Sequence, residues 1–185
     1  MPMPTLQGHT RTAFLCFFAS HIPITLLIDG QALFPRHYYP KIFRDAVDWY
    51  ATTFKDKLLI HPPTWFSSLI AIEFVFQVPF FLLAVYAIAR RSHDDDDDDD
   101  ERKGTSNKIQ GDGVFRSLCM IYGSSTATTL IPIFASIFTQ RDTTVVEKAI
   151  LLCFYLPYII FPLWLVVIAV CEENVFGKKM GKKSN

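Results

Sequence analysis

Four long apolar segments constrain the fold of this chain more than any other feature. They run from about Thr12 to Phe34, Phe66 to Ala89, Val114 to Phe138 and Ala149 to Val170. Each exceeds the ~20 residues that a helix needs to cross about 30 Å of hydrocarbon. Lipid offers no partner to an unpaired backbone group, so helices are the expected structure. The sequence therefore predicts an all-α integral membrane protein built as a bundle of four transmembrane helices.

Charged residues lie almost wholly between these segments. Their sum is a net formal charge of zero, which leaves no overall field to attract nucleic acid. Because the charged residues are separated from the apolar segments, we expect the chain to lie in a lipid bilayer. We do not expect it to bind nucleic acid. The first segment is interpreted as a retained span, because it is long for a signal peptide and Asp29 and Gln31 interrupt its end.

Proline and cysteine add two expectations. Every segment contains proline, and proline bends a helix because it frees a carbonyl one turn back. The cysteines form no Cys-x-x-Cys pair and have no histidine at zinc-ligand spacing, so we expect neither a disulfide framework nor a metal site or other cofactor. The prolines are Pro23, Pro79, Pro132, Pro157 and Pro162.

The distribution of basic residues predicts an orientation. Four spans place both termini on one side, and residues 1–11, 90–116 and 171–185 together carry eleven Lys and Arg, against seven in the other two connections. The positive-inside rule then makes both termini cytosolic. Lys182 and Lys183 match the dilysine signal for retrieval to the endoplasmic reticulum, although a basic tail also attracts anionic lipid headgroups. We expect a multi-pass protein of the endoplasmic reticulum with a cytosolic N-terminus (1–11) and basic tail (171–185).

The two longer connections differ in kind. Residues 91–113 include seven consecutive aspartates, Asp94 to Asp100, which repel one another and predict a disordered cytosolic linker. A calcium site is the alternative, but the run lacks the spaced ligands and turn glycine of such a site.

Residues 35–65 show helical periodicity instead. Phe43, Val47, Tyr50 and Phe54 recur at helical spacing, with charged residues mostly elsewhere on the wheel. This pattern predicts a luminal amphipathic helix on the bundle mouth or in the membrane interface.

A few polar side chains interrupt the spans, and an ionisable residue within a span is a candidate functional residue because its burial is costly. His21 and Asp29 lie in the first span and Glu73 in the second, with Gln77 four residues later on the same helix face. At 1.5 Å per residue, Asp29, Glu73, Thr129 and Tyr158 fall roughly 7 to 14 Å below the luminal boundary. The candidate polar side chains within the spans are His21, Asp29, Glu73, Gln77, Thr129 and Tyr158.

Two carboxyls with hydroxyls and an aromatic lining suit a cationic amphiphile or a hydroxylated sterol. One carboxylate can pair with an amine while the other keeps its proton. The simpler interpretation is structural: Thr129 bonds its own backbone, Tyr158 packs as an aromatic, and His21 bonds a neighbouring helix. For Asp29 and Glu73 the functional interpretation is the stronger one, because a buried carboxyl needs a partner.

Several motifs in order resemble a known family. They are "SHIPITLLIDGQALFPRHYYP", "WYATTFKDKLL", "PPTWF", "EFVFQVPFF", "TTLIPI" and "YLPYIIFP". The chain resembles the sigma-2 receptor (transmembrane protein ninety-seven) family of the EXPERA-domain group over residues 12–170, apart from the acidic linker and the loop near 139–147. The resemblance implies a four-span membrane domain of the endoplasmic reticulum.

The resemblance also implies a ligand site. The amine-binding aspartate of the family matches Asp29 and its supporting aspartate matches Asp56, although the loop position of Asp56 alone predicts a solvated side chain. Glu73, Gln77, Thr129 and Tyr158 match the remaining polar positions. Sterol or oxysterol binding, binding of cationic amphiphiles, homodimerisation and a part in cholesterol trafficking are the implied properties.

Three functions remain open on this basis. The first is a non-catalytic receptor for sterols and amphiphilic amines. The second is a sterol isomerase-like enzyme, with Glu73 as proton donor and Asp29 or His21 as acceptor. The third is a scaffold for a membrane-protein partner, since fungal relatives are linked to delivery of mitochondrial precursors from the endoplasmic reticulum surface.

Overall fold

The computed structural model describes residues 5–96, 105–172 and 174–176, and every regular element in these ranges is a helix. The prediction of an all-α chain is confirmed. Three helical segments are long and apolar enough to cross a membrane: Gly8–Ala32, Thr64–Arg90 and Asp112–Thr139. The bent pair Val145–Tyr155 and Pro157–Cys171 makes a fourth if it is one broken span. The chain is a multi-pass membrane protein.

The first apolar segment forms two helices. Helix α1 spans Gly8–Leu27, and a short 3₁₀ helix, η1, spans Asp29–Ala32. We expected one span to Phe34. The α-helix ends earlier because Asp29 and Gly30 are poor helix formers, and the chain tightens into 3₁₀ geometry at this point.

The second segment is continuous but not uniform. It comprises α4 (Thr64–Ile72), a π-helical turn η3 (Glu73–Gln77) and α5 (Val78–Asp96). The π turn immediately precedes Pro79, whose missing N–H and bulky ring disrupt the ordinary α-helical bond to the residue four positions before it. A local change of helix type therefore accompanies this proline.

The remaining two segments form α6 (Thr105–Thr139), α7 (Val145–Tyr155) and α8 (Pro157–Cys171). Helix α7 begins with a capping box, in which the Thr144 hydroxyl accepts from the Glu147 N–H and the Glu147 carboxylate accepts from the Thr144 N–H. The axes of α7 and α8 differ by 41°. Pro157, which follows directly after the break, has no N–H to continue the α7 hydrogen-bond ladder.

Helices extend into both ends of the range 91–113, where a disordered linker was expected. Its first residues continue α5 to Asp96, and its last residues begin α6 at Thr105. Residues 97–104, including the second half of the aspartate run, lie outside the described residues.

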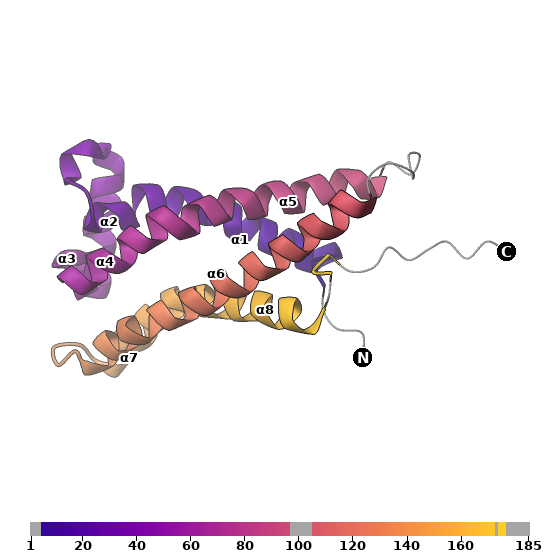
Figure 1. The fold of residues 1–185 in the computed structure, drawn as a ribbon. Helices are drawn as coiled ribbons and strands as arrows, with labels where there is room; N and C mark the ends of the chain where they lie inside the picture. Colours follow the sequence, from indigo (N-terminus) through magenta and orange to yellow (C-terminus); the bar gives the residue numbers. More distant parts are fainter. Residues whose placement is uncertain (1–4, 97–104, 173, 177–185) are drawn as a thin grey trace.

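The spans are arranged in two layers. Helix α1 packs chiefly on α5, and α6 packs chiefly on α8. Figure 1 shows these layers converging toward the end where residues 5–7 meet residues 174–176, here called the terminal end. They diverge toward the end that carries α2, α3 and α7, here called the α2 end.

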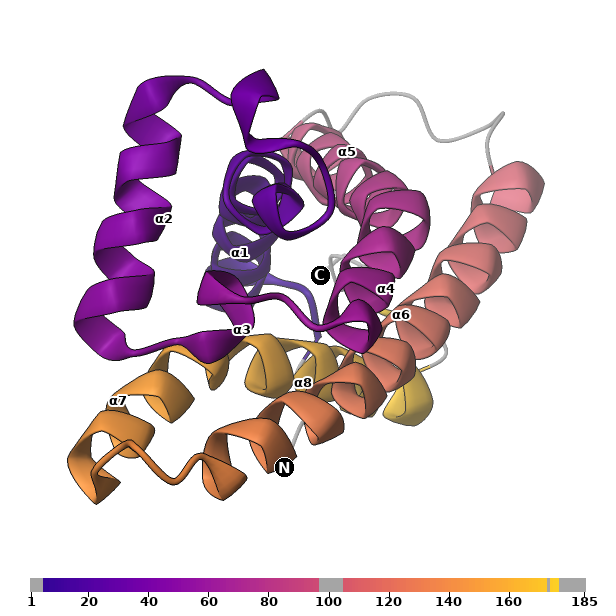
Figure 2. The ribbon, with the colours of Figure 1, turned by 90° about the vertical axis from the view of Figure 1, so that its left-hand side faces the viewer.

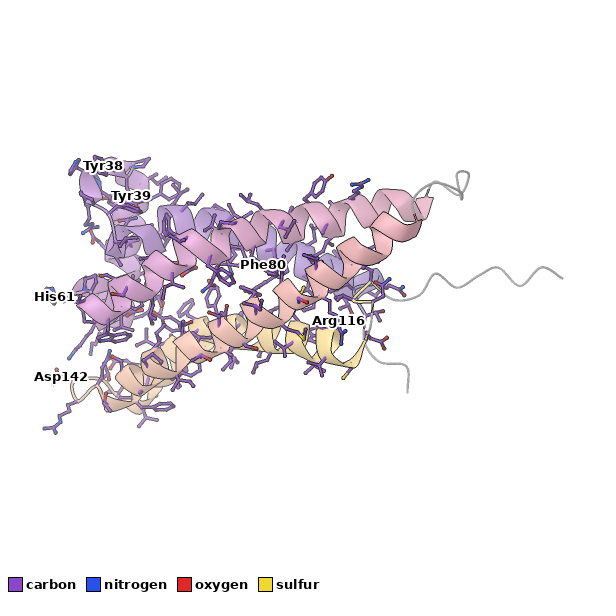
Figure 3. The ribbon with its side chains drawn as sticks, viewed as in Figure 1. Tyr38, Tyr39, His61, Phe80, Arg116 and Asp142 are labelled. Carbon is purple, nitrogen blue, oxygen red and sulfur yellow. The ribbon has the colours of Figure 1, made fainter. Side chains whose placement is uncertain are left out.

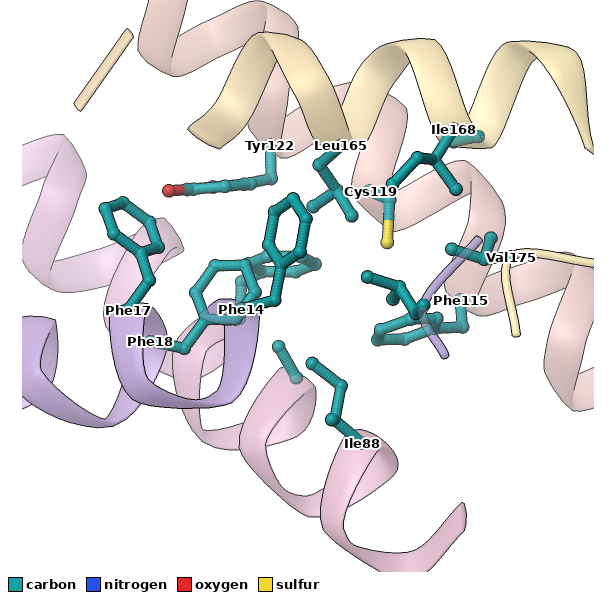
Figure 4. Packing of buried hydrophobic residues seen from close by; sticks show 14 of the residues in the cluster. Phe14, Phe17, Phe18, Ile88, Phe115, Cys119, Tyr122, Leu165, Ile168 and Val175 are labelled. Atoms are coloured by element: carbon teal, nitrogen blue, oxygen red, sulfur yellow. The ribbon is translucent and has the colours of Figure 1, made fainter. Parts of the chain in front are cut away.

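Aromatic packing joins the layers near the terminal end. Phe80 of α5 stacks on Tyr122 of α6 with ring centroids 4.4 Å apart. Phe14 and Phe18 of α1 are also fully enclosed in this cluster, where Figure 4 shows them beside Tyr122. A second apolar cluster lies at the α2 end; its buried members are Leu58, Phe66, Ile70, Leu130, Ile133, Ile137 and Leu151.

The connection between the first two spans crosses the α2 end. It contains the 3₁₀ helix η2 (Arg36–Tyr38), α2 (Lys41–Phe54) and α3 (Lys57–Ile60). Figure 2 looks along α1 and shows α2 lengthwise, so α2 runs transverse to the spans. The predicted amphipathic helix is therefore present as α2.

Two ion pairs fasten this connection to the other layer. The Lys55 ammonium lies 2.7 Å from the Glu147 carboxylate, and the Lys57 ammonium lies 2.6 Å from the Asp142 carboxylate. The neighbouring Lys57 lowers the pKa of the exposed Asp142 carboxyl. Asp142 projects beyond the helices at the α2 end in Figure 3. Solvent screens exposed pairs of this kind, so they position the connection more than they stabilise it.

Candidate functional site

The polar side chains lie between the two apolar clusters, where α1, η3, α6 and α8 meet. Glu73 begins the π turn η3 and is at the centre of one group. The Thr25 hydroxyl donates to Glu73 Oε1 at 2.6 Å, and His21 Nε2 lies 3.6 Å from the same oxygen. His21 and Thr25 are four residues apart in α1, which places both on one helix face. The first and second spans are thus joined by a partly buried carboxyl, a buried hydroxyl and a buried imidazole.

Aromatic rings enclose the His21 imidazole. The ring centroids of Tyr158, Phe81 and Phe17 lie 4.6, 4.7 and 5.1 Å from the His21 centroid. His21 Nδ1 is buried and has no hydrogen-bond partner among the described residues. Such a nitrogen normally finds a partner, so a bound water or ligand atom would complete its bonding.

Gln77 ends the π turn and is buried against α6. The Thr126 hydroxyl lies 3.3 Å from Gln77 Oε1 and bonds the Tyr122 carbonyl at 2.9 Å. The Thr129 hydroxyl donates to the Thr126 carbonyl of its own helix at 2.9 Å. Thr126, and not Thr129, therefore makes the contact between α6 and η3.

Asp29 occupies the first position of η1 and is half-buried. Its carboxyl group makes no hydrogen bond or ion pair within the described ranges, but it lies within electrostatic reach of the carboxyls of Glu73 and Asp56. The adjacent Gly30 is approached closely: a Cβ there would lie 2.5 Å from the Tyr39 hydroxyl and 2.7 Å from Cζ of Phe74. The missing side chain at Gly30 lets these two aromatics close over the backbone beside Asp29.

Asp56 is 1% exposed although it lies in a connection. It caps α3 by accepting from the Leu58 N–H at 3.0 Å. It also accepts from the Tyr155 hydroxyl at 3.1 Å and the Tyr50 hydroxyl at 3.4 Å. Burial raises the pKa of the Asp56 carboxyl, and the hydrogen bonds from Tyr155 and Leu58 oppose this rise. Asp56 thus joins α2, α3 and α7 at one buried carboxyl.

Replacing Asp56 by alanine is expected to destabilise the protein by roughly 2–4 kcal/mol. The change removes an N-cap, worth about 1 kcal/mol, and leaves the buried Tyr155 hydroxyl unpaired, which costs about 1–3 kcal/mol. Thermal unfolding followed by circular dichroism measures the loss. Asp48→Ala is the matched control, because Asp48 is exposed and its ion-pair partner Arg36 is exposed as well. This change should destabilise the protein by about 0.5 kcal/mol or less. Equal melting temperatures for the two variants would refute the bonding described for Asp56.

The charge of this region is strongly one-sided. No Lys or Arg occurs between Arg11 and Arg36, between Lys57 and Arg90, between Arg116 and Arg141, or between Lys148 and Lys178. Among the described residues, the ion-pair partner of Asp29, Asp56 and Glu73 is His21 alone, through Glu73. Asp29 and Glu73 lie in these lysine- and arginine-free ranges, and Asp56 has no ion-pair partner among the described residues although Lys55 and Lys57 flank it. Carboxyls of this kind favour a cationic ligand, since buried charges are normally paired.

The structure brings together most of the side chains selected from the sequence. Glu73 lies beside His21 and within electrostatic reach of Asp29 and Tyr158, whereas Asp56 lies at the α2 end. Thr129 bonds its own helix instead, which is the simpler of the two interpretations given above. Lys182 and Lys183 lie outside the described residues.

Sequence reasoning did not identify Thr25, and it treated Asp56 as solvated apart from the resemblance. Thr25 was detectable as the residue four positions after His21 on the same face. Asp56 was detectable as an N-cap, because Asp is a preferred residue there and an apolar run follows it.

The chain is similar in sequence to several known proteins. The profile of EXPERA (EXPanded EBP superfamily) matches residues 42–169. The chain is 39% identical to the sigma intracellular receptor 2 of Macaca fascicularis over 178 residues, covering 90% of each protein. It is 39% identical to the Homo sapiens protein of the same name over 162 residues, covering 82% of this chain and 81% of the other. Efficient mitochondria targeting-associated protein 19 of Schizosaccharomyces pombe is 24% identical over 172 residues, covering 89% of this chain and 77% of its own.

Proposed function

The chain belongs to the EXPERA (expanded EBP) superfamily, and from this membership we propose that it is a membrane receptor for sterols and cationic amphiphiles. The ligand lies between the two helix layers, with its ammonium group at Asp29. The observation that carries this proposal is the Asp29 carboxyl, which has no cationic partner of its own among the described residues and lies near two further carboxyls. The sterol part rests on the superfamily and on the aromatic surroundings of His21 and Tyr158.

Each side chain of the proposed site has a different role. Asp29 pairs with the ammonium group, while Glu73 is held by Thr25 and His21. His21 Nδ1 and Gln77 offer polar atoms to a ligand hydroxyl, and Asp56 supports the site by tying α2 and α3 to α7. Tyr158 and Phe81 supply apolar contact.

A matched ligand pair tests the proposal. An amphiphilic amine is expected to bind the purified protein, in nanodiscs of fixed composition, about 10- to 150-fold more tightly than its neutral analogue with carbon in place of nitrogen. This factor follows from the ~1.5–3 kcal/mol contributed by a hydrogen bond to a charged group. An oxysterol is expected to displace the amine competitively. Equal affinity for the amine and its analogue, or non-competitive displacement, would count against one shared site.

A second candidate function is sterol isomerisation, favoured by the proximity of His21 and Glu73. An imidazole 3.6 Å from a carboxyl in an aromatic environment is a suitable proton acceptor and donor pair. Incubating the protein with a ring-unsaturated sterol, followed by ultraviolet and mass-spectrometric analysis, decides this. A shifted double bond would establish the enzyme, and an unchanged sterol would leave the receptor.

We further propose that the protein resides in the endoplasmic reticulum with both termini in the cytosol, so that α2 is luminal, and that it forms homodimers. The word "intracellular" in the names of the receptor relatives supports an internal membrane, and the basic-residue count supports the orientation.

The name of the fungal relatives, efficient mitochondria targeting-associated protein 19, leaves a scaffold role as the third candidate. Partner capture that is unaffected by Asp29 and Glu73 substitutions would favour that role.

A further inference from the structure

The outward face of α2 carries a largely apolar stripe that the rest of the described chain does not cover. Ile42, Ala46, Trp49 and Thr53 are separated by four, three and four residues, so they line one face of the helix. All four are exposed, Ile42 by 71% and Trp49 by 64%. We call these four residues the α2 stripe.

The stripe adjoins the face by which α2 packs on the bundle. That inner face contains the buried Val47 and Ala51. It also contains Tyr50 and Phe54, whose rings lie 5.2 and 5.0 Å from the Phe154 ring of α7. At about 100° per residue, the inner face and the stripe together cover roughly 200° of the helix circumference.

Packing on the bundle alone does not account for so wide an apolar surface. A helix that packs on one side typically has an apolar stripe of roughly 100°. The charged residues of α2 are confined to the remaining arc, where Lys41 pairs with Asp45 and Arg36 pairs with Asp48. The inner face and the stripe of α2 therefore each contact an apolar environment, and the charged arc contacts water.

The position of α2 in the fold identifies the second environment. The helix lies between a membrane-spanning segment that ends at Ala32 and another that begins at Thr64. It runs transverse to α1, as Figure 2 shows. Tyr38, just before α2, is 72% exposed and lies with Tyr39 at the same end of the molecule in Figure 3. A transverse amphipathic helix beside exposed aromatics, where spans leave the membrane, is the arrangement of an interfacial helix.

We propose that α2 is an interfacial membrane helix whose stripe inserts at the boundary between lipid headgroups and acyl chains. Trp49 is the main anchor, because its indole combines a large apolar ring with a polar N–H suited to this boundary. The inner face of the same helix holds the bundle through Tyr50 and Phe54. Helix α2 thus contacts the bilayer with one face and the α7 side of the site with the adjacent face.

Trp49 fluorescence tests this inference directly. The chain contains three tryptophans, so the full-length double variant Trp65→Phe/Trp164→Phe leaves Trp49 alone. In nanodiscs, its emission is expected at shorter wavelength than in denaturant. Spin labels near the headgroup end of the acyl chains should quench it at least about twofold more strongly than labels at the chain terminus, and aqueous iodide should quench it only weakly.

A control and two contrary outcomes complete the test. The single-tryptophan variant that retains Trp164, a residue within α8, should instead respond most to deeper labels. Strong iodide quenching of Trp49 with no response to lipid labels would place the stripe in water and overturn the proposal. Protection from both quenchers that depends on the number of protein copies per disc would assign the stripe to a second copy, and would overturn it equally. If the double variant does not fold, the quenching lost between wild type and Trp49→Phe gives the same contrast.

Discussion

Replacing Asp29 by asparagine is expected to weaken binding of a cationic amphiphile by about 30- to several-thousand-fold. Removing one partner of a buried charge pair typically costs about 2–5 kcal/mol, and each 1.4 kcal/mol is a factor of ten. The effect should be large here because, among the described residues, no lysine or arginine pairs with the nearby carboxyls. A ligand ammonium is therefore the counter-charge that the variant would lose. Equilibrium binding of a radiolabelled amine to the purified variant measures the change.

The Asp29→Asn variant provides its own check on folding. The substituted amide would retain the shape of the carboxyl group and one carbonyl oxygen, and Asp29 makes no hydrogen bond within the described residues that the change would break. Melting temperature and sterol binding should therefore stay close to wild type. Asp48→Asn is the matched control, since Asp48 is an exposed carboxylate paired with Arg36, and it should bind the amine normally. If Asp29→Asn also bound the amine normally, the assignment of Asp29 would be wrong.

Substitution of Gly123 by a large side chain is expected to have the largest effect on stability. A Cβ at this position of α6 would collide with Cγ2 of Val166 and lie 2.5 Å from the Pro162 carbonyl oxygen of α8. The valine can change rotamer, but the backbone carbonyl cannot move without displacing α8. Overpacking of this kind costs about 1–3 kcal/mol for one methyl, against about 1 kcal/mol gained from the higher helix propensity of alanine.

Gly123→Ala should therefore lower the melting temperature by several degrees, and Gly123→Leu should prevent recovery of folded protein. Circular dichroism of detergent-purified protein measures the first effect, and size-exclusion profiles measure the second. Gly113→Ala is a control within the same helix, because a Cβ there would meet nothing within 4 Å. It should leave the melting temperature unchanged or raise it slightly. Equal behaviour of the two alanine variants would contradict the close approach of α6 and α8.

The helices were predictable from the sequence because lipid permits few alternatives to them, whereas their ends were not. Length and hydropathy located all four apolar segments, but α1 ends at Leu27 and not Phe34, since Asp29 and Gly30 are poor helix formers. Helix α6 begins as early as Thr105, within the range expected to be disordered.

The proximity of three site residues was also predictable, because position along a helix follows from counting residues. Asp29, Glu73 and Tyr158 were expected at one level, and they lie within electrostatic reach of one another. Rotation about the helix axis was not predictable, since it depends on packing. Thr126 faces Gln77 while Thr129 bonds its own helix, and Asp56 bonds Tyr155 from a distant part of the chain.

The break at Leu156 ties the site to the thickness of the surrounding bilayer. A span adapts to hydrophobic mismatch by tilting or bending, and the pair α7 and α8 already bends by 41° at this residue. Tyr155, which bonds Asp56, and Tyr158, which packs on His21, flank the break. A change in lipid acyl-chain length should therefore alter the bend and shift both tyrosines together. The affinity of the site for its ligand is expected to differ between short-chain and long-chain lipids.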